Sequence, residues 1–145
     1  MTYTLTITER QARVLSMACE VLARLGMGQF KDALDHLPEA KKRDWSAWHD
    51  DMEQISRILS KHMPGGIDGI RSSTGISNAD EEARTAWDLH AVIRHRRAWD
   101  RAKAEGVTDG TKREWPAMMQ VSYDEPMKYS EEPLAKMDAV QTPAV

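Results

Sequence analysis

The chain has 145 residues and a formal net charge of −3, and 30% of its residues are charged while 41% are hydrophobic. These values are typical of one folded domain and exclude a disordered chain. A net acidic protein is a poor non-specific binder of duplex nucleic acid, although a local basic face remains compatible with this composition. We expect neither duplex nucleic acid nor a membrane among the partners, since no segment approaches roughly 18 consecutive apolar residues.

The single cysteine, Cys19, excludes an intrachain disulfide. The first residues carry neither the basic nor the apolar segment of an export signal. Both features predict a cytoplasmic protein. Cys19 lies among apolar residues of an expected helix, where a buried inert thiol is a better interpretation than a nucleophile.

The N-terminal part of the chain predicts a short strand followed by a helix. Residues 3–7 alternate apolar and polar side chains, as in a half-buried strand. Thr8 and Gln11 then form a capping-box pattern, which starts a helix over about residues 9–25 that Gly26 ends. The residues of this helix that we expect to face the core are Val14, Ala18, Val21, Leu22 and Leu25.

Two more helices are predicted before a central loop. Residues 29–37 can form a short helix that Pro38 stops. Residues 38–63 predict a longer amphipathic helix, broken by Pro64 and the glycines after it. The loop that follows extends to residue 77. The apolar stripe of the longer helix is Trp45, Trp48, Met52, Ile55 and Leu59.

The C-terminal half predicts a fourth helix and an extended tail. Asn78 can cap a helix that ends near Gly106. Residues 119–123 could form a second strand that pairs with the first. The chain is therefore predicted to be mainly α, a single-domain bundle of about four helices with a small two-stranded β ribbon that the termini could form. We place the domain at residues 1–130 and an extended, partly disordered tail at 131–145.

The fourth predicted helix, residues 78–103, carries most of the chemistry. Leu89, Val92, Ile93 and Trp99 share one face with Arg96 among them, and an arginine there is costly unless an anion meets it. Arginine suits bidentate recognition of phosphate, and tryptophan offers a stacking surface. The alternative is a solvated basic face with ion pairs along the helix. For Arg96 itself, a buried structural pair with a Glu or Asp of another helix is at least as good an interpretation as a ligand. The stripe on the opposite face is Trp87, His90, Arg94, Arg97 and Arg101.

The loop before this helix is a second, weaker candidate. Small hydroxyl residues beside a glycine can offer backbone N–H groups to a phosphate. The segment lacks the lysine and spacing of a P-loop, so a plain surface loop is the alternative. Together the candidate ligand-binding residues are Arg71, Ser72, Ser73, Thr74, Trp87, His90, Arg94, His95, Arg96, Arg97 and Trp99.

No catalytic or metal motif is evident. His90 and His95 are five residues apart, so they point to different helix faces and cannot form the helical i, i+4 zinc pair. We predict no catalytic residue, no metal and no cofactor, and we favour a protein that is not an enzyme. A small enzyme with one of these histidines as a base stays an alternative.

Three segments carry a family likeness: LTITERQARVLSMACEVLARLGMGQF, EEARTAWDLHAVIRHRRAWDR and VSYDEPMKYSEEPLAKM. They resemble an uncharacterised family of small proteins encoded in tailed phages and prophages. The resemblance implies a setting, the cytoplasm of an infected or lysogenic bacterial cell, and assigns no role to any residue. Small accessory phage proteins often act against the host, either by blocking enzymes or by sequestering nucleotide immune signals.

These observations predict a phage-encoded, non-enzymatic binding protein. It would sequester a small, anionic, phosphate-bearing ligand such as a nucleotide immune signal, and so counter host anti-phage defence. One alternative is a protein–protein inhibitor or regulator of a host enzyme that uses exposed tryptophans and the tail. A single-stranded nucleic-acid binder is another. The five tryptophans, the short terminal strands and the tail also predict a homo-oligomer.

Overall fold

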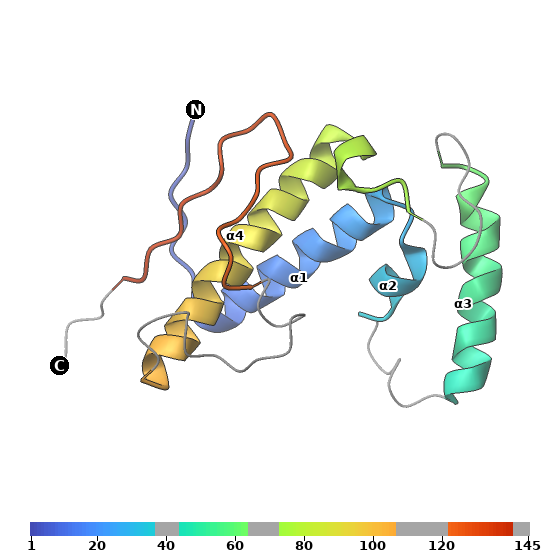
Figure 1. Cartoon of the computed structure of the whole chain (residues 1–145), viewed down its shortest axis with the longest axis horizontal. Coiled ribbons are helices and arrows are strands. Elements are labelled where there is room, and N and C mark those ends of the chain that lie inside the picture. Colours follow the sequence, from blue (N-terminus) through green and yellow to red (C-terminus); the bar gives the residue numbers. More distant parts are fainter. Residues whose placement is uncertain (37–43, 64–72, 107–121, 141–145) are drawn as a thin grey trace.

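The computed structural model describes residues 1–36, 44–63, 73–106 and 122–140, and this part of the chain is helical without a strand. The mainly α fold is therefore confirmed. In these described ranges, four α-helices and one 3-10 turn follow one another (Figure 1). They are α1 (Glu9–Gly26), α2 (Phe30–Leu34), α3 (Trp45–Ser60), η2 (Ile76–Asn78) and α4 (Glu81–Ala104).

Helices α1 and α4 form the centre of the fold as an antiparallel pair (Figure 1). The Nη2 atom of Arg97 lies 3.4 Å from Glu9 at the start of α1. At the other end, a β-carbon placed on Gly26 would overlap that of Ala83. The two backbones therefore approach closely, and only glycine fits at the end of α1.

The contact face of this pair is built from small side chains. Ala12 and Ala23 of α1 are buried, as are Ala83 and Ala86 of α4. Small side chains let helices pack at short distance, where many weak dispersion contacts add up. The interior of the pair therefore contains alanine where most helix pairs place leucine or valine.

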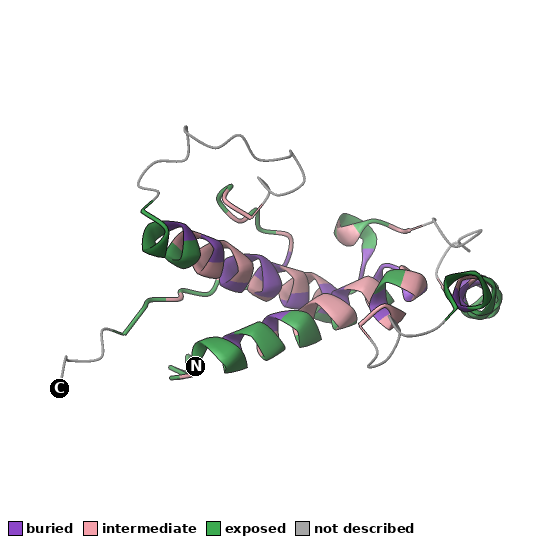
Figure 2. Ribbon diagram, turned by 90° about the horizontal axis from the view of Figure 1, so that it is seen from below, coloured by how far each residue is buried: buried purple, intermediate pink, exposed green. Residues whose placement is uncertain are grey.

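The predicted inward face of α1 is wrong. Val14 is 60% exposed, Leu22 50% and Leu25 39%. Ala18 is exposed as well, and Val21 is only partly buried. The physical reason is that α4 packs on the small-residue face of α1, which leaves the larger apolar side chains exposed. Figure 2 shows that the exposed residues of α1 lie on the side turned away from α4.

The helix boundaries follow the local signals in the sequence. Both hydrogen bonds of the capping box between Thr8 and Gln11 are present, as predicted. Helix α1 includes Gly26, and Gly28 takes the left-handed backbone conformation that follows it. Helix α4 begins later than predicted, because Asp80 and not Asn78 caps its first turn.

Helix α3 packs against α2 and lies at the edge of the fold (Figure 1). Trp48 and Met52 are buried against Leu34, and the indole N–H of Trp48 donates to Asp35. The predicted stripe is only partly correct, since Trp45, Ile55 and Leu59 are exposed. Residues 37–43, which include the start predicted for this helix, lie outside the described residues, as does the last residue of the predicted 29–37 helix.

The terminal ribbon is not formed in the part of the chain that the structure describes. Residues 1–8 are irregular, and Tyr3 and Leu5 are exposed where a half-buried strand was predicted. Residues 119–121 of the second predicted strand lie outside the described residues. Residues 123–131 instead run along α4 (Figure 1), so their contacts are with a helix. No described helix is both long and apolar enough to cross a membrane.

Candidate functional site

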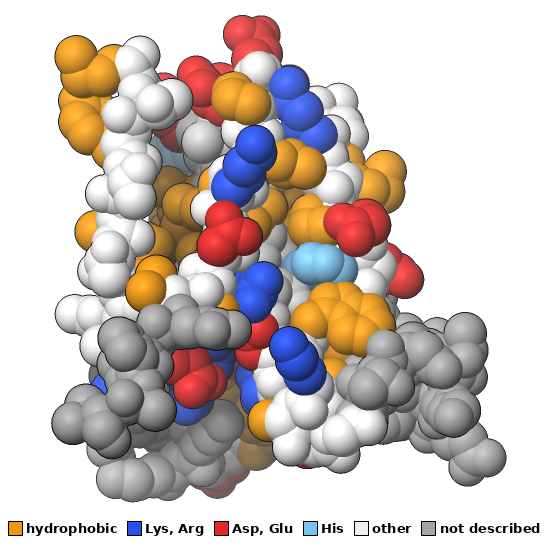
Figure 3. Space-filling view, turned by 90° about the vertical axis from the view of Figure 1, so that its left-hand side faces the viewer, with side chains coloured by type: hydrophobic (Ala, Val, Ile, Leu, Met, Phe, Trp, Pro, Cys, Tyr) orange, Lys and Arg blue, Asp and Glu red, His pale blue; other side chains and the backbone are white. Residues whose placement is uncertain are grey.

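Charges of both signs are interspersed on the surface. On the face drawn in Figure 3, Lys and Arg side chains form a column that Asp and Glu side chains interrupt, with hydrophobic side chains beside it. A uniformly basic surface would attract polyanions without selectivity. Any anion site on this face must therefore depend on a particular arginine and its environment.

The predicted basic stripe of α4 faces α1. The Nδ1 atom of His90 lies 2.9 Å from the Ser16 hydroxyl, and Arg97 pairs with Glu9. Arg24 of α1 lies over the ring of Trp87, 6.0 Å from its centroid. These side chains line the seam between the two helices, while Arg101 one turn further on is exposed. The stripe is therefore not a fully solvated face.

His90 is the most enclosed member of the stripe, with 5% of its surface exposed. Its Nδ1 atom lies 3.0 Å from the Ser16 carbonyl oxygen, which can only accept, so we infer that Nδ1 carries the proton. The Nε2 atom is then an acceptor, and it is buried without a hydrogen bond. Burial lowers the pKa of His90, and the Ser16 carbonyl and the charge of Glu20 only partly oppose this. His90 is therefore neutral at pH 7.

Arg94 lies one turn further along the same stripe and is half-buried. Its Nε atom is buried without a hydrogen bond, and within the described residues no carboxylate reaches ion-pair distance of its guanidinium. Burial lowers the pKa of Arg94, while the negative charge of Glu20 opposes the shift. An arginine keeps its charge under such conditions, so Arg94 is a partly dehydrated cation that no residue in the described part of the chain pairs with directly.

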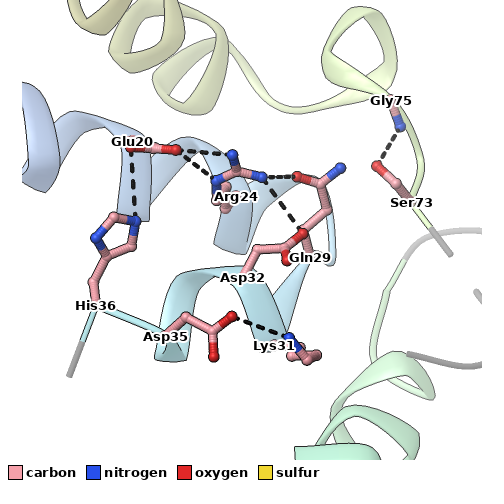
Figure 4. A network of polar contacts seen from close by, with 9 residues as sticks. All are labelled: Glu20, Arg24, Gln29, Lys31, Asp32, Asp35, His36, Ser73 and Gly75. Atoms are coloured by element: carbon pink, nitrogen blue, oxygen red, sulfur yellow. Dashed lines mark hydrogen bonds and ion pairs between the residues drawn. The ribbon is translucent and has the colours of Figure 1, made fainter. Parts of the chain in front are cut away.

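Glu20 is already engaged by two other side chains (Figure 4). Its Oε1 atom accepts from Arg24 at 2.8 Å, and its Oε2 atom lies 3.7 Å from Nε2 of His36. Burial favours the neutral carboxyl, but the Arg24 hydrogen bond and the nearby positive charges outweigh it and lower the pKa of Glu20. The carboxylate therefore acts on Arg94 only through space.

The Glu20 cluster was not among the predicted site residues. Its only signal in the sequence is the spacing of Glu20 and Arg24, which places them one helical turn apart. Arg24 also donates to Gln29 at 2.8 Å and approaches Asp32 at 3.5 Å, so it joins α1 to α2. The cluster holds the short helix α2 beside the seam.

On the opposite face of α4, the other predicted site residues are bound within the chain. Arg96 pairs with Asp100 at 2.9 Å, and its Nε atom donates to the same carboxylate. The indole N–H of Trp99 donates to the Tyr123 carbonyl, and His95 lies 3.8 Å from Glu125. The partner that Arg96 requires is thus a carboxylate of its own helix.

Asp88 is the strongest polar anchor on this face, and the sequence did not indicate it. Its buried carboxylate accepts hydrogen bonds from the backbone N–H of Tyr129 and of Ser130, and from the Ser130 hydroxyl at 2.6 Å. Glu81 accepts from the N–H of Glu131 in the same way. Backbone donors have no signature in a sequence, so this attachment could not be read from residue types.

The described part of the predicted phosphate loop lies near Trp87, at one end of the basic stripe, and far from Arg97 at the other end. Arg71 and Ser72 lie outside the described residues. Ser73 accepts from the N–H of Gly75, and Thr74 donates its N–H to the Met27 carbonyl at 3.0 Å. Met27 follows the last turn of α1, whereas Arg97 pairs at the first turn, roughly 25 Å away at the rise of a helix.

The seam residues do not form a metal site, since no group of three metal-binding side chains occurs in the described ranges. Comparison of the chain with protein-family models, with curated proteins and with solved structures found no match.

Proposed function

We propose that the chain is a non-enzymatic binding protein that takes a phosphate-bearing small ligand at Arg94, on the seam between α1 and α4. The observation that carries the proposal is the half-buried guanidinium of Arg94, which makes no hydrogen bond or ion pair within the described residues. A partly dehydrated arginine gains most from an anion with two oxygens, because its N–H groups match them in pairs.

Neighbouring side chains support such a ligand. Arg97 also has a buried Nε atom without a hydrogen bond, and its carboxylate partner among the described residues, Glu9, is largely exposed. An exposed ion pair contributes little, so a phosphate can replace it at small cost. Trp87 lies two turns before Arg94, roughly 10 Å along the helix. A ligand with a phosphate at one end and an aromatic ring at the other spans that distance.

The setting of the family likeness defines the ligand class and the role that we propose. In an infected or lysogenic bacterial cell, a nucleotide immune signal carries both a phosphate and a ring. Tight binding without turnover would lower its free concentration and so counter host defence. Non-enzymatic action is favoured because Ser16 and His90, the one Ser–His pair on the seam, are both buried, and a nucleophile needs access to its substrate.

Calorimetric titration of the full chain with cyclic dinucleotides, cyclic trinucleotides and ADP-ribose derivatives tests the proposal. We expect one class to bind, and Arg94→Ala to weaken its binding by about 10- to 150-fold, the cost of losing charged hydrogen bonds. Arg101→Ala is the matched control, because Arg101 continues the stripe but is exposed, and it should bind within about twofold of the wild type. No binding to any of these compounds at micromolar protein would overturn the proposal.

A further inference from the structure

The middle of the seam holds a buried acceptor that no described residue uses. His90 is 5% exposed, and its Nδ1 atom donates toward the Ser16 carbonyl oxygen, 3.0 Å away. The two nitrogens of an imidazole point to different sides of the ring, so Nε2 faces away from Ser16. The Nε2 atom is buried and has no hydrogen bond in the described part of the chain. Such an acceptor has lost water without gaining a donor, which favours any donor that can reach it.

Trp87, His90 and Arg94 lie in this order along one stripe of α4. The helical rise places His90 roughly 4.5 Å beyond Trp87, and Arg94 about 6 Å beyond His90, along the helix axis. The rings of Trp87 and His90 have centroids 5.6 Å apart. Burial is the main cause of the lowered pKa of His90, and the positive charge of Arg94 adds to it, so these two side chains are also close. A stacking surface, a hydrogen-bond acceptor and a phosphate-binding group therefore follow one another along the seam.

We propose that Nε2 of His90 accepts a hydrogen bond from a ribose hydroxyl of the ligand, so that the site selects ribonucleotides over 2′-deoxyribonucleotides. The inference rests on the proposed function, because it assigns the sugar of the ligand whose phosphate binds Arg94. A nucleotide carries its ribose between its phosphate and its base, which is the order of Arg94, His90 and Trp87 along the seam. The 2′-hydroxyl is the donor that ribose has and deoxyribose lacks. An acceptor at the position of the sugar therefore recognises ribose.

The side chain of Arg94 controls access to this acceptor. Long side chains on a helix lean over the turn before their own residue, so Arg94 leans toward His90. A phosphate that draws the guanidinium outward uncovers His90, and the sugar attached to that phosphate can then reach Nε2. The Ser16 hydroxyl lies on the Nδ1 side of the imidazole, 2.9 Å from that atom, and stays covered. The ligand therefore meets an acceptor and not a nucleophile, which agrees with binding without turnover.

Calorimetric titration of the full chain with matched ribose and deoxyribose compounds tests the inference. The probes are cyclic diadenylate, cyclic triadenylate and ADP-ribose, each compared with its 2′-deoxy analogue. The compound that binds should do so about 10- to 100-fold more tightly than its analogue, because its hydroxyl bonds to a buried acceptor. His90→Leu removes the acceptor and should bring the two affinities within about twofold of each other. His95→Leu is the matched control, because His95 is also partly buried but lies on the other face of α4, and it should keep the wild-type ratio.

Nitrogen NMR of the His90 imidazole in the wild type gives a readout that depends on no variant. The free protein should carry the proton on Nδ1, and the ribose form of the bound probe should shift the Nε2 resonance, whereas its 2′-deoxy analogue should not.

Two results would overturn the inference alone. One is a proton on Nε2 in the free protein, since that atom would then be a donor. The other is equal affinity for the ribose and deoxyribose forms while Arg94→Ala still weakens both, in which case the proposed function stands. If no probe binds at micromolar protein, the inference and the proposed function are both wrong.

Discussion

Helices α1 and α4 reverse the usual relation between an apolar pattern and burial. Helix α1 carries a regular stripe of large apolar residues and leaves it open. The apolar face of helix α4 is interrupted by Arg96, yet residues 90–93 in the middle of the helix are all buried, because α1 covers one face and residues 123–131 contact the other. An apolar stripe therefore marks where a partner can pack, and it does not identify which partner does.

The difference follows from how closely the backbones can approach. Alanine on both helices allows a short distance between them, and the close approach of Gly26 to Ala83 extends this to the end of the pair. Helix α4 must also bury polar groups, so it carries Asp88 toward the C-terminal segment and His90 toward Ser16. Because α4 makes both polar and apolar contacts of this kind, its buried residues do not form a single apolar face. A measure of amphipathicity therefore does not identify them.

The largest expected effect is the difference in the free energy of unfolding between substitutions on the two faces of α1. Ala23→Leu would insert a large side chain into the alanine contact with α4, where Ala23 is fully buried. We expect the free energy of unfolding to fall by about 3 kcal/mol through overpacking. Ala18→Leu makes the same change on the exposed face and should alter it by less than about 0.5 kcal/mol.

Urea unfolding at a protein concentration low enough to keep the chain monomeric measures both changes. Equal destabilisation by the two variants would show that both faces of α1 are packed, and the contrast between the helices would then be wrong.

Changing one atom of Asp88 should weaken the contact between α4 and the C-terminal segment. Asp88→Asn keeps the size of the side chain but turns one acceptor into a donor, against the N–H groups of Tyr129 and Ser130. The free energy of opening of this segment should fall by about 2 kcal/mol, which is roughly a 30-fold faster amide exchange. Hydrogen exchange read by mass spectrometry on the segment around these residues checks this.

Glu81→Gln is the control for that experiment. Glu81 accepts one exposed N–H, that of Glu131, and glutamine keeps an acceptor oxygen, so exchange should change less than about threefold. If the two variants accelerated exchange equally, the buried carboxylate of Asp88 would not be the anchor of the segment.

Some local signals in the sequence were reliable, whereas the alternation of residues 3–7, the expected cap at Asn78 and the contacts between distant residues were not. The capping box of Thr8 and Gln11 acts within one turn, and it was predicted correctly. The packed face of α1 depends on α4, more than fifty residues away, and amphipathicity alone chose the wrong face. For the site, the stripe that holds Arg94 follows from helical periodicity, but its position against α1 does not. The engagement of Glu20 by Arg24 and His36 likewise depends on tertiary contacts.

The smallest effect concerns the polar part of the α1–α4 contact. His90 is buried with a pKa below its ordinary value of about 6.5. As the pH falls below that value, the unfolded chain binds a proton at His90 that the folded chain still excludes. The free energy of unfolding should then decrease by at most about 1.4 kcal/mol per pH unit. Above pH 7 both states are neutral at this residue, so the contribution is constant.

Urea unfolding between pH 7.5 and 5 isolates this residue from Glu20. The lowered pKa of Glu20 gives a stability that is complete above its ordinary value of about 4.5 and is lost only at lower pH. His90→Gln should flatten the profile, because an amide can still donate to the Ser16 carbonyl but does not titrate. His62→Gln, at an exposed position, should keep the wild-type slope. A slope that survives in His90→Gln would assign the acid sensitivity to another group, and the buried contact between α1 and α4 would then be independent of pH.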